Sequence, residues 1–359
     1  MNDASGRELA EGANSGNCSP CSEASERSGG SGRFVLILGA SAAILIGVCI
    51  LGLTMGPSSV SVTDIVNLIT GQQISQTAES IILHVRLPRV LGAVFAGSAL
   101  AVSGAVIQSV LDNPLASPNI IGINSGAGLA VLLAASMLPH MLWLLPLAAF
   151  LGSLITAALI FGISAGSSAS KLTVILAGIA ITTVFGAGMN TILIVNPDAY
   201  VGSATFLVGG LSGVMLSDIF WPAIYIVAGV LLSLMFGSKL NLLALGDQTA
   251  HSLGVNVART RLLLLGLAAI LAGAAVSIAG LLGFVGLIIP HVMRFFVGHD
   301  NRKVIPVSIF AGAAFVVGCD VIARTLFAPY ELPVGILMAF LGGPFFIYLI
   351  LCNRREGII

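Results

Sequence analysis

The chain has 359 residues, of which 57% are hydrophobic and 8% are charged, and its mean hydropathy is +1.06. In soluble domains roughly a quarter of the residues are charged, so this composition excludes a water-soluble globular protein. The formal net charge is zero, with 15 basic and 15 acidic residues, and the sequence therefore predicts no nucleic-acid partner.

The first 33 residues are rich in Ser, Gly, Asn and Glu and show no apolar periodicity. This composition predicts a disordered tail. Cys18 and Cys21 within it have C-x-x-C spacing, but no second pair and no histidine cluster completes a four-ligand metal site. We assign no metal and no other function to the tail.

Ten apolar segments follow, each able to cross about 30 Å of hydrocarbon at about 1.5 Å per residue. They lie at residues 34–53, 88–110, 119–138, 142–165, 172–195, 218–237, 258–279, 281–298, 304–327 and 332–352. The segment at 281–298 is short and is interrupted by Pro290, whereas 200–216 favours a short helix packed at the surface. The sequence thus predicts an all-α polytopic membrane bundle over residues 34–353, followed by a short end at 354–359.

Basic residues beside membrane helices favour the cytoplasmic side. With ten crossings and a cytoplasmic N-terminus, twelve of the 15 basic residues fall inside, together with the C-terminus, and only Arg86, Arg89 and Arg324 fall outside. Arg324 follows Asp320 by one helical turn, so it is either a counter-ion for that carboxylate or a group with an external purpose. Arg86 and Arg89 either bind a partner protein or reach lipid phosphates at the interface.

Small residues recur at four-residue spacing in two of the predicted spans. The first set is Ala93, Gly97, Ala101 and Ala105, and the second is Ala269, Gly273 and Ser277. Lipid gives helices no hydrophobic reason to associate, so such stripes predict closely packed helices.

The sequence shows no nucleotide-binding or catalytic motif and few charged residues within the spans that could couple transport to an ion gradient. The sequence contains no P-loop, no H-E-x-x-H, no G-x-S-x-G and no Rossmann fingerprint. Ion-coupled carriers usually hold charged groups inside their helices, and Asp320 is the main one here. His291 follows Pro290 and favours a structural role over a ligand role. We therefore predict no catalytic residue, no enzyme activity and no bound cofactor; a secondary transporter or channel and a polytopic membrane enzyme are the alternatives.

The longest cytoplasmic segment inside the bundle is "KLNLLALGDQTAHSLGVNVARTR", Lys239 to Arg261. Its apolar positions recur at helical spacing, and Gly246 and Gly254 punctuate it, which predicts two short helices with a turn between them. An amphipathic turn on the lipid surface is the alternative, but basic residues occur only at its ends. A compact, partly apolar knob over residues 239–257 is better suited to a groove on a partner protein.

Several long strings carry a resemblance to a known family. They are "RLPRVLGAVFAGSALAVSGAVIQ", "DNPLASPNIIGINSGAG", "LNLLALGDQTAHSLGV", "GLLGFVGLIIPHVMRFFVGHDNRKVIP", "DVIART" and "ELPVGILMAFLGGPFFIYLI". From about residue 34 to 353, the sequence resembles the FecCD family, the permease subunits of ABC importers for iron–siderophore complexes, haem and cobalamin.

The resemblance implies a type II ABC importer permease bundle in the inner (cytoplasmic) membrane. It also implies a homodimer, two ABC ATPase subunits that use ATP and Mg, and a substrate-binding protein on the outer side. The spans at 172–195 and 332–352 would line the substrate path. An iron chelate (siderophore or haem) is the expected cargo, with cobalamin as the alternative.

The resemblance further implies roles for individual residues. Arg86, Arg89 and Arg324 would receive acidic residues of the binding protein. The residues expected to dock on the ATPase are Leu245, Gly246, Asp247, Ala250, Leu253 and Gly254. Ser167, Ser168 and Ser170 would lie near a cytoplasmic gate.

Overall fold

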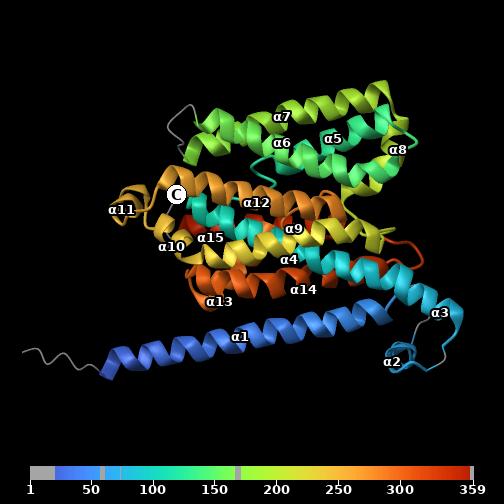
Figure 1. Ribbon diagram of the computed structural model, residues 1–359, viewed down its shortest axis with the longest axis horizontal. Helices are drawn as coiled ribbons and strands as arrows, with labels where there is room; N and C mark the ends of the chain where they lie inside the picture. The colour runs from blue at the N-terminus through green and yellow to red at the C-terminus, as the bar shows by residue number, and fades with distance from the viewer. Residues whose placement is uncertain (1–20, 57–60, 73, 166–170, 356–359) are drawn as a thin grey trace, which may run out of the picture.

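A computed structural model describes residues 21–56, 61–72, 74–165 and 171–355 (Figure 1). All regular structure within these residues is helical. The helices are α1 (Cys21–Thr54), α2 (Val62–Thr70), α3 (Gln76–Ile81), the π-helical turn η1 (Ile82–Arg86), α4 (Leu87–Leu111), α5 (Ile123–Met137), the 3-10 turn η2 (Leu142–Leu144), α6 (Leu145–Ala165), α7 (Lys171–Val195), α8 (Asp198–Val208), α9 (Leu216–Met235), α10 (Gly237–Ala244), α11 (Asp247–Ser252), α12 (Val257–Ala279), α13 (Val285–Val297), α14 (Asn301–Thr325) and α15 (Val334–Arg355).

The described helices account for each predicted span. Within the part of the chain that the structure describes, seven helices are long and apolar enough to cross a membrane, and three shorter apolar helices lie at Ile123–Met137, Val285–Val297 and Val334–Leu349. The prediction of an all-α polytopic bundle is confirmed. α8 is the short helix expected within 200–216, and its Ala199 and Ser203 are buried against the bundle.

α1 begins at Cys21, inside the segment expected to be a disordered tail. A helix that already exists extends at the gain of about one hydrogen bond per residue, so polar residues can continue it beyond the apolar run. Cys18 and the rest of residues 1–20 lie outside the described part of the chain.

α4 lies at the centre of the bundle, and 83% of its most apolar stretch is buried. It packs against α9, α12, α13 and α14. Figure 1 shows α5, α6 and α7 on one side of α12 and α1 on the opposite edge, beside α14. One end of the bundle holds the start of α1, the pair α10 and α11, and the end of α15, whereas α2, α3 and α8 lie at the other end. An even number of crossings produces this arrangement.

Glycine allows α4 to approach its neighbours closely. The predicted stripe of small residues in α4 is buried throughout, as is the stripe in α12. A Cβ atom at Gly97 would overlap the backbone of Gly312 in α14, and one at Gly104 would overlap Gly286 in α13. The predicted packing role of these residues is confirmed.

The chain leaves the helical path between α12 and α13. Gly280 has a φ of 68° and Phe284 has a φ of 65°, so the helix ends and restarts here. The sequence placed the interruption at Pro290, and this prediction is wrong, because Pro290 lies inside α13. A proline removes only its own N–H donor, which leaves the carbonyl of Gly286 without a helical partner but does not end the helix.

Candidate functional sites at the two ends of the bundle

The segment predicted to couple to a partner forms two short helices, as expected. α10 and α11 are separated at Gly246, whose φ of 99° lies in the left-handed region that favours glycine. Gly254, with a φ of 83°, ends the following turn before α12 begins. Both glycines that punctuate the sequence are therefore required by the backbone.

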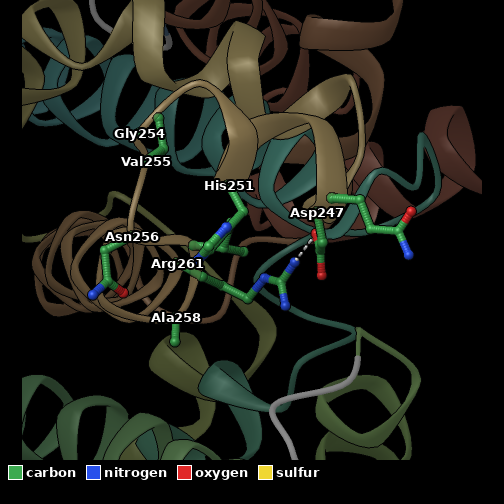
Figure 2. Close-up of a pocket in the computed structure, with 9 residues that line it drawn as sticks. Asp247, His251, Gly254, Val255, Asn256, Ala258 and Arg261 are labelled. Carbon is green, nitrogen blue, oxygen red and sulfur yellow. Dashed lines mark hydrogen bonds and ion pairs between the residues drawn. The ribbon is translucent and has the colours of Figure 1, made fainter.

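α11 and the start of α12 line an open surface pocket of about 800 Å³ (Figure 2). Its lining consists of Asp247, Gln248, His251, Gly254, Val255, Asn256, Val257, Ala258 and Arg261. Arg261 Nη2 donates to Asp247 Oδ1 over 2.6 Å, which the dashed line in Figure 2 marks. Arg261 is buried at the start of α12. The ion pair therefore ties α11 to α12 across the pocket.

Some apolar residues of this segment are buried and others are exposed. Ala250 is fully buried, and its carbonyl accepts a hydrogen bond from the backbone N–H of Val255 at 3.0 Å. Leu245 and Leu253 are 61% and 57% exposed. Figure 1 shows α11 projecting beyond the end of the bundle. Two exposed leucines on a projecting helical pair are apolar surface that a partner could cover.

At the opposite end of the bundle, two of the three outlying arginines hold the end of α1. Arg86 Nη1 donates to the carbonyls of Leu53 and Thr54 at 2.6 and 2.7 Å, and Arg324 Nη2 donates to the carbonyl of Gly52. The last four carbonyls of a helix have no helical donors, and the helix dipole favours a positive charge beside them. Arg86 and Arg324 therefore cap the C-terminus of α1.

The third arginine, Arg89, bridges two carboxylates. Its Nε lies 2.9 Å from Asp320 Oδ1, and its Nη1 lies 2.7 Å from Glu331 Oε2. Arg324 Nε stands 3.6 Å from Asp320 Oδ2. Glu331 lies between α14 and α15, with a side chain that is 33% exposed, and it accepts a hydrogen bond from Ser212 Oγ at 3.1 Å. Burial raises the pKa of Glu331, but the hydrogen bonds and charge of its partners outweigh burial, and the net pKa is lowered.

The three arginines expected to receive acidic residues of a binding protein are buried in this chain, and their docking role stays a prediction. Arg86, Arg89 and Arg324 are only 2%, 5% and 3% exposed, and each is engaged inside the chain. The end of α1 and the carboxylate of Asp320 provide acceptors that draw the guanidinium groups inward. The counter-ion alternative for Arg324 agrees with its distance from Asp320. An acidic partner protein would reach these arginines only by replacing one of their internal acceptors.

The predicted gate residues Ser167, Ser168 and Ser170 lie outside the described residues. α7 begins directly after them, at Lys171.

Sequence reasoning missed a set of buried polar side chains in the half of the bundle nearest α10. Gln108 and Ser109 of α4 are 2% and 5% exposed. Gln108 Nε2 donates to the carbonyl of Gly286 at 3.1 Å and so replaces the donor that Pro290 lacks, while Arg294 Nη1 donates to Gln108 Oε1. A glutamine and a serine side by side near the end of an apolar span were the available signal, since buried polar groups in a membrane bundle need partners.

The comparisons with known proteins agree with this architecture. The model of the FecCD transport family matches residues 44–352. The chain belongs to this family. It is 39% identical over 327 residues to the hemin transport system permease protein HmuU of Yersinia pestis, covering 89% of this chain and 97% of that protein. It is 40% identical over 280 residues to the cobalamin import system permease protein BtuC of Halobacterium salinarum, covering 77% of this chain and 75% of that protein.

A solved structure supports the same assignment. This FecCD permease aligns with an inward-facing conformation of a metal-chelate type ABC transporter at a TM-score of 0.79 and 31% identity, covering 88% of this chain and 98% of that chain. It is therefore a multi-pass membrane protein and a permease of the ABC importer class, as the sequence predicted.

Proposed function

We propose that this permease carries a bulky iron chelate, of the haem or siderophore class, as part of an ATP-driven importer in the inner (cytoplasmic) membrane. The observation that carries the ATP-driven part is the projecting pair α10 and α11, with Leu245 and Leu253 exposed at the end of a bundle whose sequence has no nucleotide motif. The near full-length similarity to a hemin permease supports the cargo class. Cobalamin is the second candidate, supported by the 40% identity to a cobalamin permease.

The working unit is a homodimer with two ABC ATPase subunits, which bind ATP and Mg, and an outer substrate-binding protein. Both termini of the permease are cytoplasmic. Each ATPase would cover one copy of Leu245 and Leu253, and full burial of one such side chain contributes about 1.5–3 kcal/mol. In the most apolar stretch of α7 only 17% of the residues are buried. This helix therefore offers surface to lipid or to the second copy of the permease.

The binding protein would dock at the α2 and α3 end, through Arg89 in particular. Glu331 is the most exposed internal partner of the arginines, so a carboxylate of the docking protein could take its place on Arg89 without leaving a buried charge unpaired. Arg86 and Arg324 stay on the end of α1 and add positive potential that orients an acidic partner.

The test uses the permease copurified with its ATPase subunits and reconstituted in liposomes with ATP inside. Binding protein is added outside with hemin, a ferric hydroxamate or cobalamin. We expect ATP-dependent accumulation of an iron chelate and no accumulation by the permease alone. Uptake by the permease alone along an ion gradient would refute the ATP-driven importer, and uptake of cobalamin alone would establish the second candidate.

A further inference from the structure

Four helices near the α10 end of the bundle are joined by a continuous set of side-chain hydrogen bonds, which we name the polar link. Its members are Asn241 of α10, Asp300 and Asn301 at the start of α14, Gln108 and Ser109 of α4, and Arg294 of α13.

The polar link begins where α10 meets the start of α14. Asn241 Nδ2 donates to Asp300 Oδ1 at 2.6 Å, and Asn241 Oδ1 accepts from the backbone N and from Nδ2 of Asn301 at 2.8 and 2.9 Å. Asp300 is also the N-cap of α14, because its Oδ1 accepts from the backbone N–H of Arg302 at 3.0 Å. One side chain of α10 therefore holds both the cap and the first residue of α14.

The link then passes from α14 to α4. Ser109 Oγ lies 2.8 Å from Asn301 Oδ1 and accepts a hydrogen bond from Arg294 Nη2 at 3.1 Å. Asn301 and Ser109 are 2% and 5% exposed. A buried polar group that loses its partner keeps the full cost of desolvation, so these bonds resist separation of the helices.

The link ends at the incomplete turn of α13. Gln108 Nε2 donates to the carbonyls of Gly286 and Leu287 at 3.1 and 3.3 Å, while Gln108 Oε1 accepts from Arg294 Nη1. The acceptors of Arg294 in the described part of the chain all belong to α4. α13 is thus held to α4 at two points, one of them the carbonyl that Pro290 leaves without a helical donor.

α13 in turn contacts α15. Phe284, the residue before α13, fills the space that a side chain at Gly342 of α15 would occupy. His291 of α13 stands edge-on to Phe345 of α15, with ring centroids 6.1 Å apart. A displacement of α13 therefore reaches α15, one of the two helices expected to line the substrate path.

We propose that the polar link transmits movement of α10 and α11 to α13 and then to α15. Packed apolar helices can slide past one another in small shears, whereas short directional hydrogen bonds hold fixed points together. Asn241, Gln108 and Arg294 are then positioning residues for transport, without contact to cargo. The inference rests on the proposed function, because α10 and α11 receive movement only from an ATPase partner.

The experiment measures transport and ATP hydrolysis in the reconstituted complex with hemin-loaded binding protein, or with whichever chelate the wild type carries. Asn241→Leu removes the three bonds to α14. We expect the ATPase to copurify and its hydrolysis to be stimulated as in the wild type, while cargo transported per ATP falls on the order of tenfold. Ser238→Ala is the control, because it removes a bond from α10 to Arg302 of α14, at 3.0 Å, that lies outside the polar link.

Gln108→Glu gives a second test at the other end of the link. The carboxylate keeps the acceptor for Arg294 and forms an ion pair with it, so the variant should fold, but it loses the donor to Gly286. It should also lower transport per ATP, and the double variant Asn241→Leu/Gln108→Glu should lose no more than the stronger single variant, because both act on one set of bonds.

The proposed role of the polar link would be overturned if a single variant lowered transport and ATP hydrolysis equally. It would also be overturned if the losses in transport per ATP multiplied in the double variant. Either result would leave the proposed importer function intact. Failure of the proposed function is recognised separately, as a wild-type complex that shows no ATP-dependent uptake.

Discussion

Arg89→Met leaves the carboxylate of Asp320 buried without its nearest cation. The two residues are 5% and 1% exposed, and their closest nitrogen and oxygen atoms are 2.9 Å apart. Removing one partner of a buried ion pair costs about 3–5 kcal/mol, because the remaining charge has neither solvent nor partner. Arg324 remains 3.6 Å from Asp320, a distance too long for a good hydrogen bond. Its charge still helps, so we expect the lower end of this range, about 3 kcal/mol.

The assay is thermal unfolding of the purified permease in detergent, followed by the loss of the monodisperse protein peak after heating. The apparent Tm of Arg89→Met should fall by several degrees, whereas Arg259→Met, at an exposed position, should not change it. Adding Asp320→Asn to Arg89→Met removes the buried carboxylate, while Arg324 keeps the carbonyl of Gly52 as an acceptor, so the double variant should recover part of the loss. A double variant no more stable than Arg89→Met would refute the argument from an uncompensated charge.

The pKa of Glu331 is lowered in the folded protein, so its carboxylate stabilises the fold above the ordinary pKa of 4.5. This stabilisation is lost as the pH falls through the pKa that Glu331 has in the folded protein. The Tm of Glu331→Gln should therefore depend less on pH below 4.5 than the Tm of the wild type. At neutral pH and low salt, the same variant should bind the loaded binding protein more tightly in a surface binding assay. Gly97→Leu should destabilise the bundle by at least about 1–3 kcal/mol in the melting assay, since its side chain meets the backbone of α14, whereas Gly39→Leu points into open space and serves as control. Leu245→Ser with Leu253→Ser should reduce ATPase copurification without lowering the Tm, because both side chains are exposed; a lowered Tm would contradict their placement.

The spans and the coupling helices were predictable from the sequence because their signals are local. A membrane span needs only a run of about twenty apolar residues, and every predicted run contains a helix. The two short helices of the coupling segment follow from Gly246 and Gly254, each with a positive φ that glycine adopts without strain. The close packing of α4 follows from small residues one helical turn apart.

Only the tertiary structure decided what the polar side chains do. Arg86 meets the carbonyl of Leu53, 33 residues away, and Arg89 meets Asp320, 231 residues away, so no local pattern indicated that these arginines would be internal. Likewise Pro290 does not end α13, because Gln108, 178 residues from Gly286, supplies the missing donor. Apolar segments determine by their own composition that they enter the membrane, whereas a buried charge or amide depends on whichever acceptor the folded chain brings to it.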